Sequence, residues 1–322
     1  MKTTLSRRAF LQVSLASLAA GFMPGCRSKP AAPTNTGAAH EAVAIPTPIP
    51  GTSIPATPTP GASTPVTLPG TETWSLTSQF IDQQYQIFIN KPSGYGAGNR
   101  FPALYTTDGN GLFPLIRAIY GELRAENKVP ELLLVGIGYP DDQAQDIPDL
   151  RTRDLTPYPY DPNSYEAPQI RIGRGTGGAP QFLRFIREQL KPVIDARYTT
   201  HPAETALFGH SFGGLFTLFT LFQEPLLFNR YIAASPSIWW ANAAINEEEK
   251  DYTQSHTDLP VRLFIGSGGD EGTAGADVAH LADILRGRNY PGLQVTTQVF
   301  DGQGHNSVVP FCISQGMREV YR

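Results

Sequence analysis

Between residues 71 and 322, short apolar runs alternate with longer segments in which apolar side chains recur at helical spacing. Residues 132–137 are apolar throughout, which is typical of a strand buried on both faces of a sheet. Across residues 182–197, the apolar side chains from Leu183 to Ile194 recur every three or four positions, as on one face of a helix. Further strands are predicted over residues 84–89, 101–105, 205–208, 231–234, 261–265 and 294–300, and further helices over 112–127, 212–222 and 276–286. This alternation predicts an α/β fold with a doubly wound, mostly parallel sheet.

One long segment, residues 138–179, shows neither the strand spacing nor the helix spacing of apolar residues and is rich in Pro, Asp and Gly. Loops of this length inside a compact domain are usually functional. In a doubly wound sheet we expect it to lie over the carboxyl ends of the strands, where ligands bind.

The pattern is different before residue 71. Residues 27–70 are rich in Pro and Thr, with repeated Thr-Pro and Ile-Pro steps. Proline removes amide donors and fixes φ, so this composition favours extended conformations and cannot build a sheet or a helix. The segment also has too few apolar residues to offset the entropy of ordering. We therefore expect three parts: a targeting segment at 1–26, a disordered tether at 27–70 and a folded domain at 71–322.

The first 26 residues have the layout of a secretory signal. An arginine pair, Arg7 and Arg8, precedes an apolar run over residues 9–23, which is short for a membrane span of ~20 apolar residues. The arginine pair and its flanks resemble a twin-arginine export signal, and residues 23–26 resemble a lipobox that ends at Cys26. We expect an exported protein on the periplasmic or extracellular face of the envelope, anchored to the membrane by a lipid on Cys26. The alternative is a plain signal peptide with an incidental cysteine.

Charge and cysteine content narrow the function classes. The formal net charge is −4, and no basic stripe interleaves with aromatic residues, so nucleic acid is not an expected partner. Cys26 and Cys312 are the two cysteines, and Cys312 lies in an apolar setting that favours a packed side chain. No H-E-x-x-H or C-x-x-C pattern occurs, and the glycine-rich run 173–178 lacks the lysine of a P-loop. We expect neither a metal nor a cofactor.

A G-x-S-x-G motif, residues 209–213, lies between a predicted strand and a predicted helix. This arrangement is typical of a nucleophile elbow, in which glycines leave room for a serine held in a strained turn. Ser211 is therefore the candidate nucleophile, and the amide of Phe212 at the helix N-terminus is a candidate donor to an oxyanion. The alternative is a glycine-rich turn with an incidental serine.

A serine hydroxyl needs a base, and His305 is the candidate. It lies in a glycine-flanked loop after the last predicted strand, where the chain order Ser, acid, His places the base. The alternative is a surface loop histidine.

The acid is expected in the loop at 266–272, after the strand at 261–265. Asp270 is preferred, Glu271 is the alternative, and a site without either acid is the third possibility.

A second oxyanion donor is expected from the loop at 107–111, where the backbone amide of Asn110 is the candidate. A simple turn between strand and helix explains the same residues.

At these residues the chain resembles the putative-esterase family of α/β hydrolases, and within it most of all the enterochelin-type siderophore esterases. The matching stretches are residues 104–109, 151–157, 182–214, 234–240 and 304–307. The resemblance implies a serine–histidine hydrolase of the α/β-hydrolase fold, whose acid can be displaced or absent.

The resemblance also implies residues that border the substrate. Arg151 or Arg153 is expected to pair with an anionic oxygen of the substrate, or else to form an ion pair with Asp154 or Asp149. Trp239 and Trp240 are expected to stack on an aromatic acyl group, or else to pack under the elbow.

Three functions follow. The first is a serine carboxylic-ester hydrolase that acts on a siderophore trilactone or a related aryl or acyl ester. The second is an esterase that removes feruloyl or acetyl groups from polysaccharide. The third is a non-catalytic binding protein of the envelope that uses a hydrolase scaffold.

Overall fold

The computed structural model describes residues 66–96, 98–160 and 170–322. The chain divides into two units, Met1–Thr64 and Pro65–Arg322, and the second unit holds the described residues. The predicted targeting segment, its Cys26 and the tether up to residue 65 lie outside the described residues. Within the described part, no helix combines the length and the apolar character that crossing a membrane requires.

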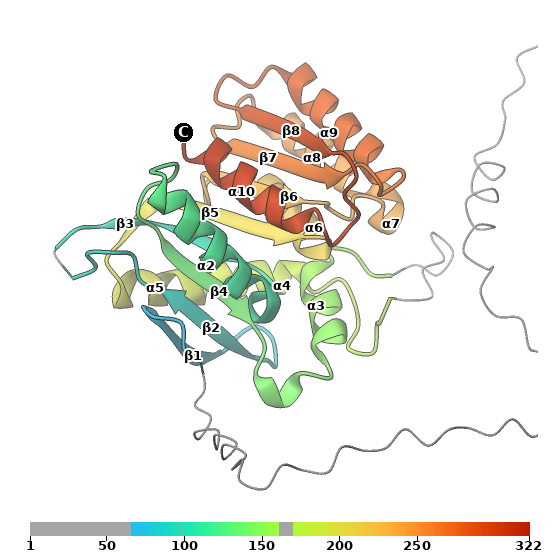
Figure 1. Cartoon of the computed structure of the whole chain (residues 1–322). Helices are drawn as coiled ribbons and strands as arrows, with labels where there is room; N and C mark the ends of the chain where they lie inside the picture. Colours follow the sequence, from blue (N-terminus) through green and yellow to red (C-terminus); the bar gives the residue numbers. More distant parts are fainter. Residues whose placement is uncertain (1–65, 97, 161–169) are drawn as a thin grey trace, which may run out of the picture. The chain divides into compact units, whose positions relative to one another are not determined.

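An eight-stranded sheet with the order β1-β2-β4-β3-β5-β6-β7-β8 forms the centre of the second unit (Figure 1). The strands are β1 Thr71–Thr77, β2 Gln84–Asn90, β3 Phe101–Thr106, β4 Leu133–Gly138, β5 Thr200–His210, β6 Arg230–Ala234, β7 Arg262–Gly268 and β8 Gln294–Phe300. Neighbouring strands pair in parallel along the part of the sheet with the order β4-β3-β5-β6-β7-β8. The pairs β1–β2 and β2–β4 are antiparallel. The predicted doubly wound, mostly parallel α/β fold is confirmed.

Helices cover both faces of the sheet. They are α2 Gly109–Ala125, α3 Ile147–Leu155, α4 Ala179–Phe185, α5 Lys191–Arg197, α6 Phe212–Gln223, α7 Trp240–Ala243, α8 Ile245–Ser255, α9 Ala274–Arg288 and α10 Val309–Val320. α2 and α10 lie side by side on one face, in front of the sheet in Figure 1, and the other helices pack on the opposite face. The central strands are therefore covered on both sides, as a parallel sheet requires.

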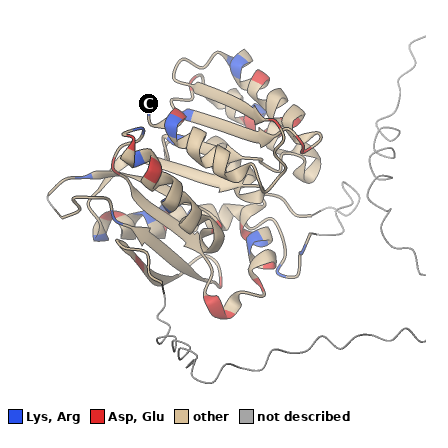
Figure 2. Cartoon of the chain, in the orientation of Figure 1, with Lys and Arg blue, Asp and Glu red and all other residues tan. Residues whose placement is uncertain are grey.

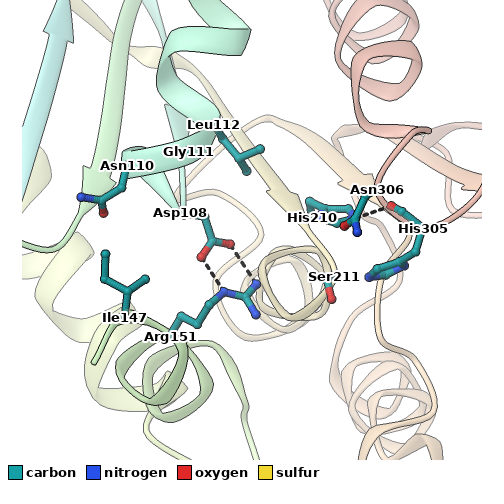
Figure 3. Close-up of a pocket in the computed structure, with 10 residues that line it drawn as sticks. All are labelled: Asp108, Asn110, Gly111, Leu112, Ile147, Arg151, His210, Ser211, His305 and Asn306. Atoms are coloured by element: carbon teal, nitrogen blue, oxygen red, sulfur yellow. Dashed lines mark hydrogen bonds and ion pairs between the residues drawn. The ribbon is translucent and has the colours of Figure 1, made fainter. Parts of the chain in front are cut away.

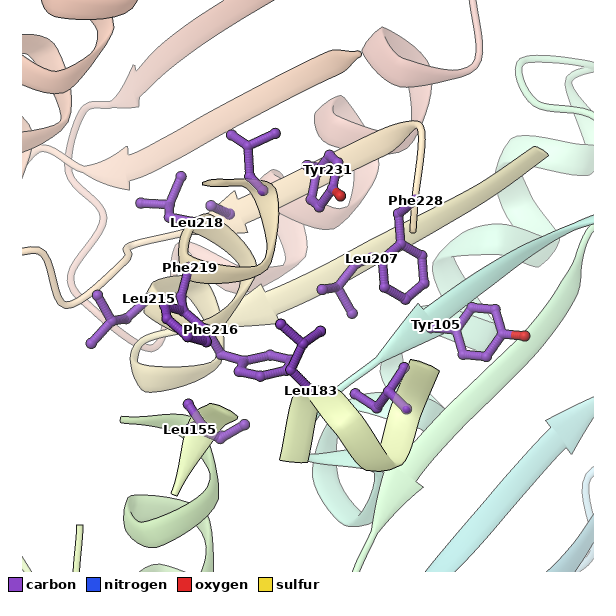
Figure 4. Packing of buried hydrophobic residues seen from close by; sticks show 14 of the residues in the cluster. Tyr105, Leu155, Leu183, Leu207, Leu215, Phe216, Leu218, Phe219, Phe228 and Tyr231 are labelled. Carbon is purple, nitrogen blue, oxygen red and sulfur yellow. The ribbon is translucent and has the colours of Figure 1, made fainter. Parts of the chain in front are cut away.

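Alternate side chains of each central strand enter two separate cores. On β5, Leu207 belongs to the core beneath α4 and α6, whereas Ala206 and Phe208 belong to the core beneath α2 and α10. Figure 4 shows the first core, where Leu207 packs with Phe216 and other large side chains. Cys312 lies fully buried in the second core, as its apolar setting predicted. Successive side chains of a strand point to opposite faces of the sheet, so each strand contributes to both cores. The core beneath α6 holds this helix, and with it the elbow, against the sheet.

The helix predicted over residues 182–197 forms as part of a continuous helical stretch, but its middle is π-helical. α4 ends at Phe185, a π-helical turn covers Ile186–Leu190, and α5 begins at Lys191. Pro192 explains this change, because proline has no amide hydrogen and its ring clashes with the carbonyl four residues earlier. The π-helical turn absorbs this mismatch.

Several elements were not predicted. β1 is a half-exposed edge strand with a weak apolar pattern. In the segment 138–179, expected to lack regular structure, a 3₁₀ turn forms at Asp141–Gln143 and α3 at Ile147–Leu155, while residues 161–169 lie outside the described residues. α10 buries residues such as Val309, Ile313 and Met317, whose spacing of four is a helical signal present in the sequence. α7 and α8 were also not predicted.

Lys and Arg residues are interspersed with Asp and Glu residues along the described ribbon (Figure 2). Many of them form exposed pairs of opposite charge, such as Arg184 of α4 with Glu188 of the π-helical turn, and Arg286 with Asp283 on α9.

Candidate active site

Ser211 occupies a sharp turn between β5 and α6. Its backbone angles are φ 61° and ψ −119°, in a region that residues with a side chain rarely adopt. A Cβ on Gly209 would overlap the carbonyl of Gly213, so the turn can close this tightly only with glycine at position 209. The motif 209–213 therefore forms the strand–turn–helix arrangement that the sequence predicted.

The turn leaves the Ser211 hydroxyl accessible from a cavity of about 360 Å³. The cavity is lined by Asp108, Asn110, Gly111, Leu112, Ile147, Arg151, His210, Ser211, His305 and Asn306 (Figure 3). Four of these ten residues were candidates from the sequence: Asn110, Arg151, Ser211 and His305. Ser211 and His305 come from loops 94 positions apart in the chain, and the parallel order of β5, β6, β7 and β8 brings them to one edge of the sheet.

The carboxylate that contacts His305 is Glu271. Its Oε2 lies 2.6 Å from Nδ1 of His305, and its Oε1 accepts hydrogen bonds from the Ser235 hydroxyl and the Gly268 amide, each at 2.6 Å. Only 5% of the Glu271 side chain is exposed. Burial acts to raise the pKa of Glu271, but the hydrogen bonds from Ser235, His305 and Gly268 outweigh it and hold the pKa below its usual value.

The preference for Asp270 as the acid is corrected by this geometry. Asp270 is exposed, and its backbone amide donates to the carbonyl of Gln303 at 3.0 Å. β7 ends at Gly268, and the turn that follows directs residue 271, not residue 270, back toward the end of the strand. The alternative named from the sequence, Glu271, takes the place expected of the acid.

Among the described residues, His305 and Ser211 do not form a hydrogen bond with each other. The Ser211 hydroxyl forms a hydrogen bond of 3.4 Å with the Ser237 hydroxyl, and the imidazole of His305 is anchored through Nδ1 to Glu271. This anchoring leaves Nε2 as the nitrogen available to the cavity. Catalytic hydrogen bonds are often long without substrate and tighten when it binds.

His210 supports the loop that carries His305. Its Nε2 lies 2.8 Å from the His305 carbonyl oxygen, and the two imidazole rings are 4.6 Å apart. Burial, together with the nearby His305, lowers the pKa of His210 to about 4, so the ring is neutral near pH 7. This role of His210 was not predicted from the sequence, because its partner is a backbone carbonyl 95 residues away.

The two candidate substrate arginines have different surroundings. Arg151 on α3 lines the cavity and binds Asp108 through two hydrogen bonds, of 2.7 and 3.1 Å. Burial opposes the charge of Arg151, but Asp108 more than compensates and raises its pKa. Asp108 itself adopts a left-handed conformation, φ 54°, at the start of α2. Its role was not predicted from the sequence, since an aspartate before a helix is ordinarily a cap.

Arg153 does not line the cavity. It forms an ion pair of 2.6 Å with Asp154, which is fully buried and also accepts hydrogen bonds from Tyr85 and Tyr139. The second interpretation offered for this arginine, an ion pair with Asp154, is the one that the structure shows. The network ties α3 to the sheet and so positions Arg151.

Asn110 lies across the cavity from Ser211, with Asp108 and Arg151 between them (Figure 3). Its side chain donates to the Tyr139 carbonyl at 2.7 Å and accepts from the Tyr139 amide at 2.8 Å, which fastens the start of α2 to the end of β4. The amides of Asn110 and Phe212 are in the first turns of α2 and α6, where helical amides lack a carbonyl partner within the helix. The assignment of both amides to an oxyanion stays a prediction.

The two tryptophans also differ. Trp240 is buried, donates from Nε1 to the Tyr158 carbonyl at 3.1 Å and contacts the Phe212 ring, so it packs under the elbow. Trp239 is half-buried and lines a second cavity next to His305.

Among the residues that the structure describes, no three His, Cys, Asp or Glu side chains gather as metal ligands would.

Comparison with known proteins decides the family, because the model of the family described as "Putative esterase" matches residues 78–310. The chain belongs to this esterase family. The family match and the esterases among its relatives identify the protein as a carboxylic ester hydrolase.

Relatives of this esterase include the ferri-bacillibactin esterase BesA of Bacillus subtilis, which is 32% identical over 261 residues, 78% of this chain and 90% of the relative. The siderophore enterobactin esterase of Emericella nidulans is 37% identical over 207 residues, 58% of this chain and 66% of the relative. Among solved structures, the BES protein from Bacillus cereus superposes with a TM-score of 0.73 at 29% identity, covering 81% of this chain and all of that one. The resemblance stated from the sequence motifs is confirmed.

Proposed function

We propose that this esterase hydrolyses ester bonds of siderophores, with Ser211 as nucleophile, His305 as base and Glu271 as the acid. The observation that carries the mechanism is the 2.6 Å contact between Glu271 and His305, at the wall of the cavity into which the elbow presents Ser211. The substrate class rests on the relatives, which include a ferri-bacillibactin esterase and a siderophore enterobactin esterase.

In the acylation step, Oγ of Ser211 attacks the ester carbonyl carbon, and its proton passes to Nε2 of His305. The carbonyl oxygen becomes an oxyanion close to the N-terminus of α6, where the amide of Phe212 donates to it. Collapse of the tetrahedral intermediate breaks the bond to the alcohol oxygen, which takes the proton from His305. The acyl group remains on Ser211.

In the deacylation step, His305 removes a proton from water, and the resulting hydroxide attacks the acyl–Ser211 ester. The proton then returns to Oγ of Ser211 as the carboxylic acid leaves. Glu271 holds the imidazole through Nδ1 and stabilises the imidazolium that forms in both steps. Its lowered pKa keeps it ionised for this role.

The acyl half of the substrate contacts a mixed surface. Leu112 and Ile147 supply apolar walls, and the Arg151–Asp108 pair supplies a charged one. Because both nitrogens of Arg151 that face Asp108 are engaged, we expect the arginine to orient polar groups of the acyl half through its remaining N–H groups.

Ser211→Ala tests this function directly. We expect the variant to fold as the wild type does and to lose on the order of 10⁴-fold or more in kcat, because the nucleophile is absent. Opening of a siderophore trilactone would be followed by mass spectrometry beside an aryl ester and an acetylated or feruloylated sugar. Ser255→Ala, at an exposed position at the end of α8, is the control.

The wild type is expected to hydrolyse the trilactone with a kcat/KM at least about tenfold above that for the acylated sugars. A preference for the sugars would favour the polysaccharide esterase, and a lack of hydrolysis of every ester would favour the binding protein. Near wild-type turnover by Ser211→Ala would contradict the nucleophile.

We also propose that the esterase is exported and held at the envelope by a lipid on Cys26. The arginine pair, the short apolar run and the Gly25–Cys26 step support this proposal.

A further inference from the structure

A second cavity, of about 330 Å³, adjoins the catalytic histidine. It is lined by Ser235, Pro236, Trp239, Asp270, Glu271, Thr273, Ala274 and His305. His305 is the residue that this lining shares with the cavity of Ser211. The side chain of His305 is 45% exposed, and the residue lines both cavities, so it lies between them.

We propose that this second cavity binds the alcohol half of the ester, which is the leaving group of acylation. This inference rests on the proposed roles of Ser211 and His305. The acyl half becomes bonded to Ser211, so it must occupy the cavity that contains Ser211. The alcohol oxygen receives its proton from His305, so the alcohol half must lie beside the imidazole. The second cavity is lined by His305 but not by Ser211, so it lies beside the base and outside the space that the acyl half occupies.

The walls of this cavity define the chemistry of the alcohol. Trp239 presents an aromatic wall, and its ring is held by Phe212 at 6.0 Å and Trp240 at 5.9 Å between ring centres. The carboxylate of Glu271 is occupied by His305, Ser235 and Gly268, whereas Asp270 is exposed at the rim.

Among the described residues that line this cavity there is no Lys or Arg. The alcohols favoured here therefore carry an apolar or aromatic body with an ammonium or amide N–H donor directed at Asp270. Alcohols that carry a free carboxylate are disfavoured, because Asp270 repels them.

Three esters with one common acyl group test the proposal: a neutral aryl-alkyl ester, a choline ester and a glycolate ester whose alcohol half bears a carboxylate. Asp270→Asn should lower the kcat/KM ratio of choline ester to neutral ester by about tenfold and raise the ratio of glycolate ester to neutral ester by a similar factor. Burst kinetics should confine these changes to acylation, since the three substrates yield the same acyl–Ser211 intermediate. Asp283→Asn, which removes an exposed carboxylate of α9, is the matched control and should leave both ratios unchanged.

Trp239→Leu provides a second measurement and should lower kcat/KM for the aryl-alkyl ester relative to the methyl ester of the same acid. If neither Asp270→Asn nor Trp239→Leu changes these kcat/KM ratios between esters, the proposed alcohol site is wrong, while the esterase function is unaffected. An equal loss with all esters in Asp270→Asn also overturns it, because that pattern belongs to the acid of the triad. A wild type that hydrolyses none of the esters overturns both the proposed function and the alcohol site.

Discussion

Adjacent carboxylates in the loop after β7 have different surroundings. Glu271 is enclosed by three hydrogen-bond donors, while Asp270 is exposed at the rim of the second cavity. Both are acidic and both follow a buried strand, so their chemistry in isolation is nearly the same. The direction of the backbone after Gly268 and the longer side chain of glutamate separate them.

Glu271→Gln should therefore be the more damaging of the two amide substitutions. An amide in place of the triad acid supports the wrong tautomer of the imidazole, and we expect kcat to fall by roughly 10⁴-fold. Steady-state kinetics with an aryl ester would measure it, with Asp270→Asn in parallel. A larger loss of kcat in Asp270→Asn would restore the acid preferred from the sequence, and small losses in both would reduce the site to Ser211 and His305.

His210 makes the stability of the fold depend on pH. Its pKa is about 4 in the native state, against an ordinary value near 6.5 in the unfolded chain. Between these values the unfolded chain binds a proton that the native state does not, so the free energy of unfolding falls as the pH drops through this window. His210→Gln keeps a donor for the His305 carbonyl but does not titrate.

We expect urea denaturation of the His210→Gln variant to show a shallower loss of stability between pH 6.5 and pH 4 than the wild type shows. His201→Gln, at an exposed position on the same strand, is the control. Equal slopes for wild type and His210→Gln would mean that His210 is not held neutral by its surroundings.

At the scale of elements, α3 carries Arg151 into the cavity and is fastened to the sheet by a buried polar network. Asp154 binds Arg153 on its own helix, Tyr85 on β2 and Tyr139 just after β4. The network fixes where α3 lies, because each of the two tyrosines offers its hydroxyl at a set point on the sheet. The helix itself has little amphipathic pattern, so packing alone specifies its position weakly.

Asp154→Asn should consequently destabilise the fold by about 3 kcal/mol, because it leaves the charge of Arg153 without its partner. Denaturant unfolding would measure the loss. Asp283→Asn breaks an exposed pair on α9 and should change the free energy of unfolding by less than about 1 kcal/mol. Similar effects of the two substitutions would mean that the network contributes no more than a surface ion pair.

At the scale of the whole molecule, the parallel sheet collects the site from loops far apart in the sequence. The turn after β5 carries Ser211, the loop after β7 carries Glu271 and the loop after β8 carries His305. Because the carboxyl ends of parallel strands lie at one edge, these loops meet there. The family match over residues 78–310 covers the elements that supply these three residues.

Cys26 sets the predicted location of the whole molecule. If it is lipidated, wild-type protein should sediment with membranes and be released by detergent, whereas Cys26→Ser should be found in the soluble fraction. Two or more acyl chains anchor a protein stably, while one alone is marginal. Cys312→Ala, which alters the buried cysteine of α10, is the control and should stay with the membranes. Equal distribution of wild type and Cys26→Ser would contradict the anchor.

The sequence by itself determined the features that depend on neighbours along the chain. The doubly wound sheet follows from the alternation of strand-like and helix-like spacing of apolar residues. The elbow follows from a strand, a glycine-flanked serine and a helix within about two dozen residues. His305 could be singled out because a glycine-flanked loop after the last strand is also a local pattern. α10 had a helical signal of the same kind, although it was not predicted.

Only the tertiary structure decided the features that depend on direction in space. The contacts Glu271–His305, Arg151–Asp108 and His210–His305 join residues 34, 43 and 95 positions apart. A sequence pattern gives the type of each residue but not the direction of its side chain. Of the two adjacent acidic residues in the turn after β7, one has a buried side chain and the other an exposed one. The sheet determines these directions because hydrogen bonding between parallel strands fixes where each loop leaves it.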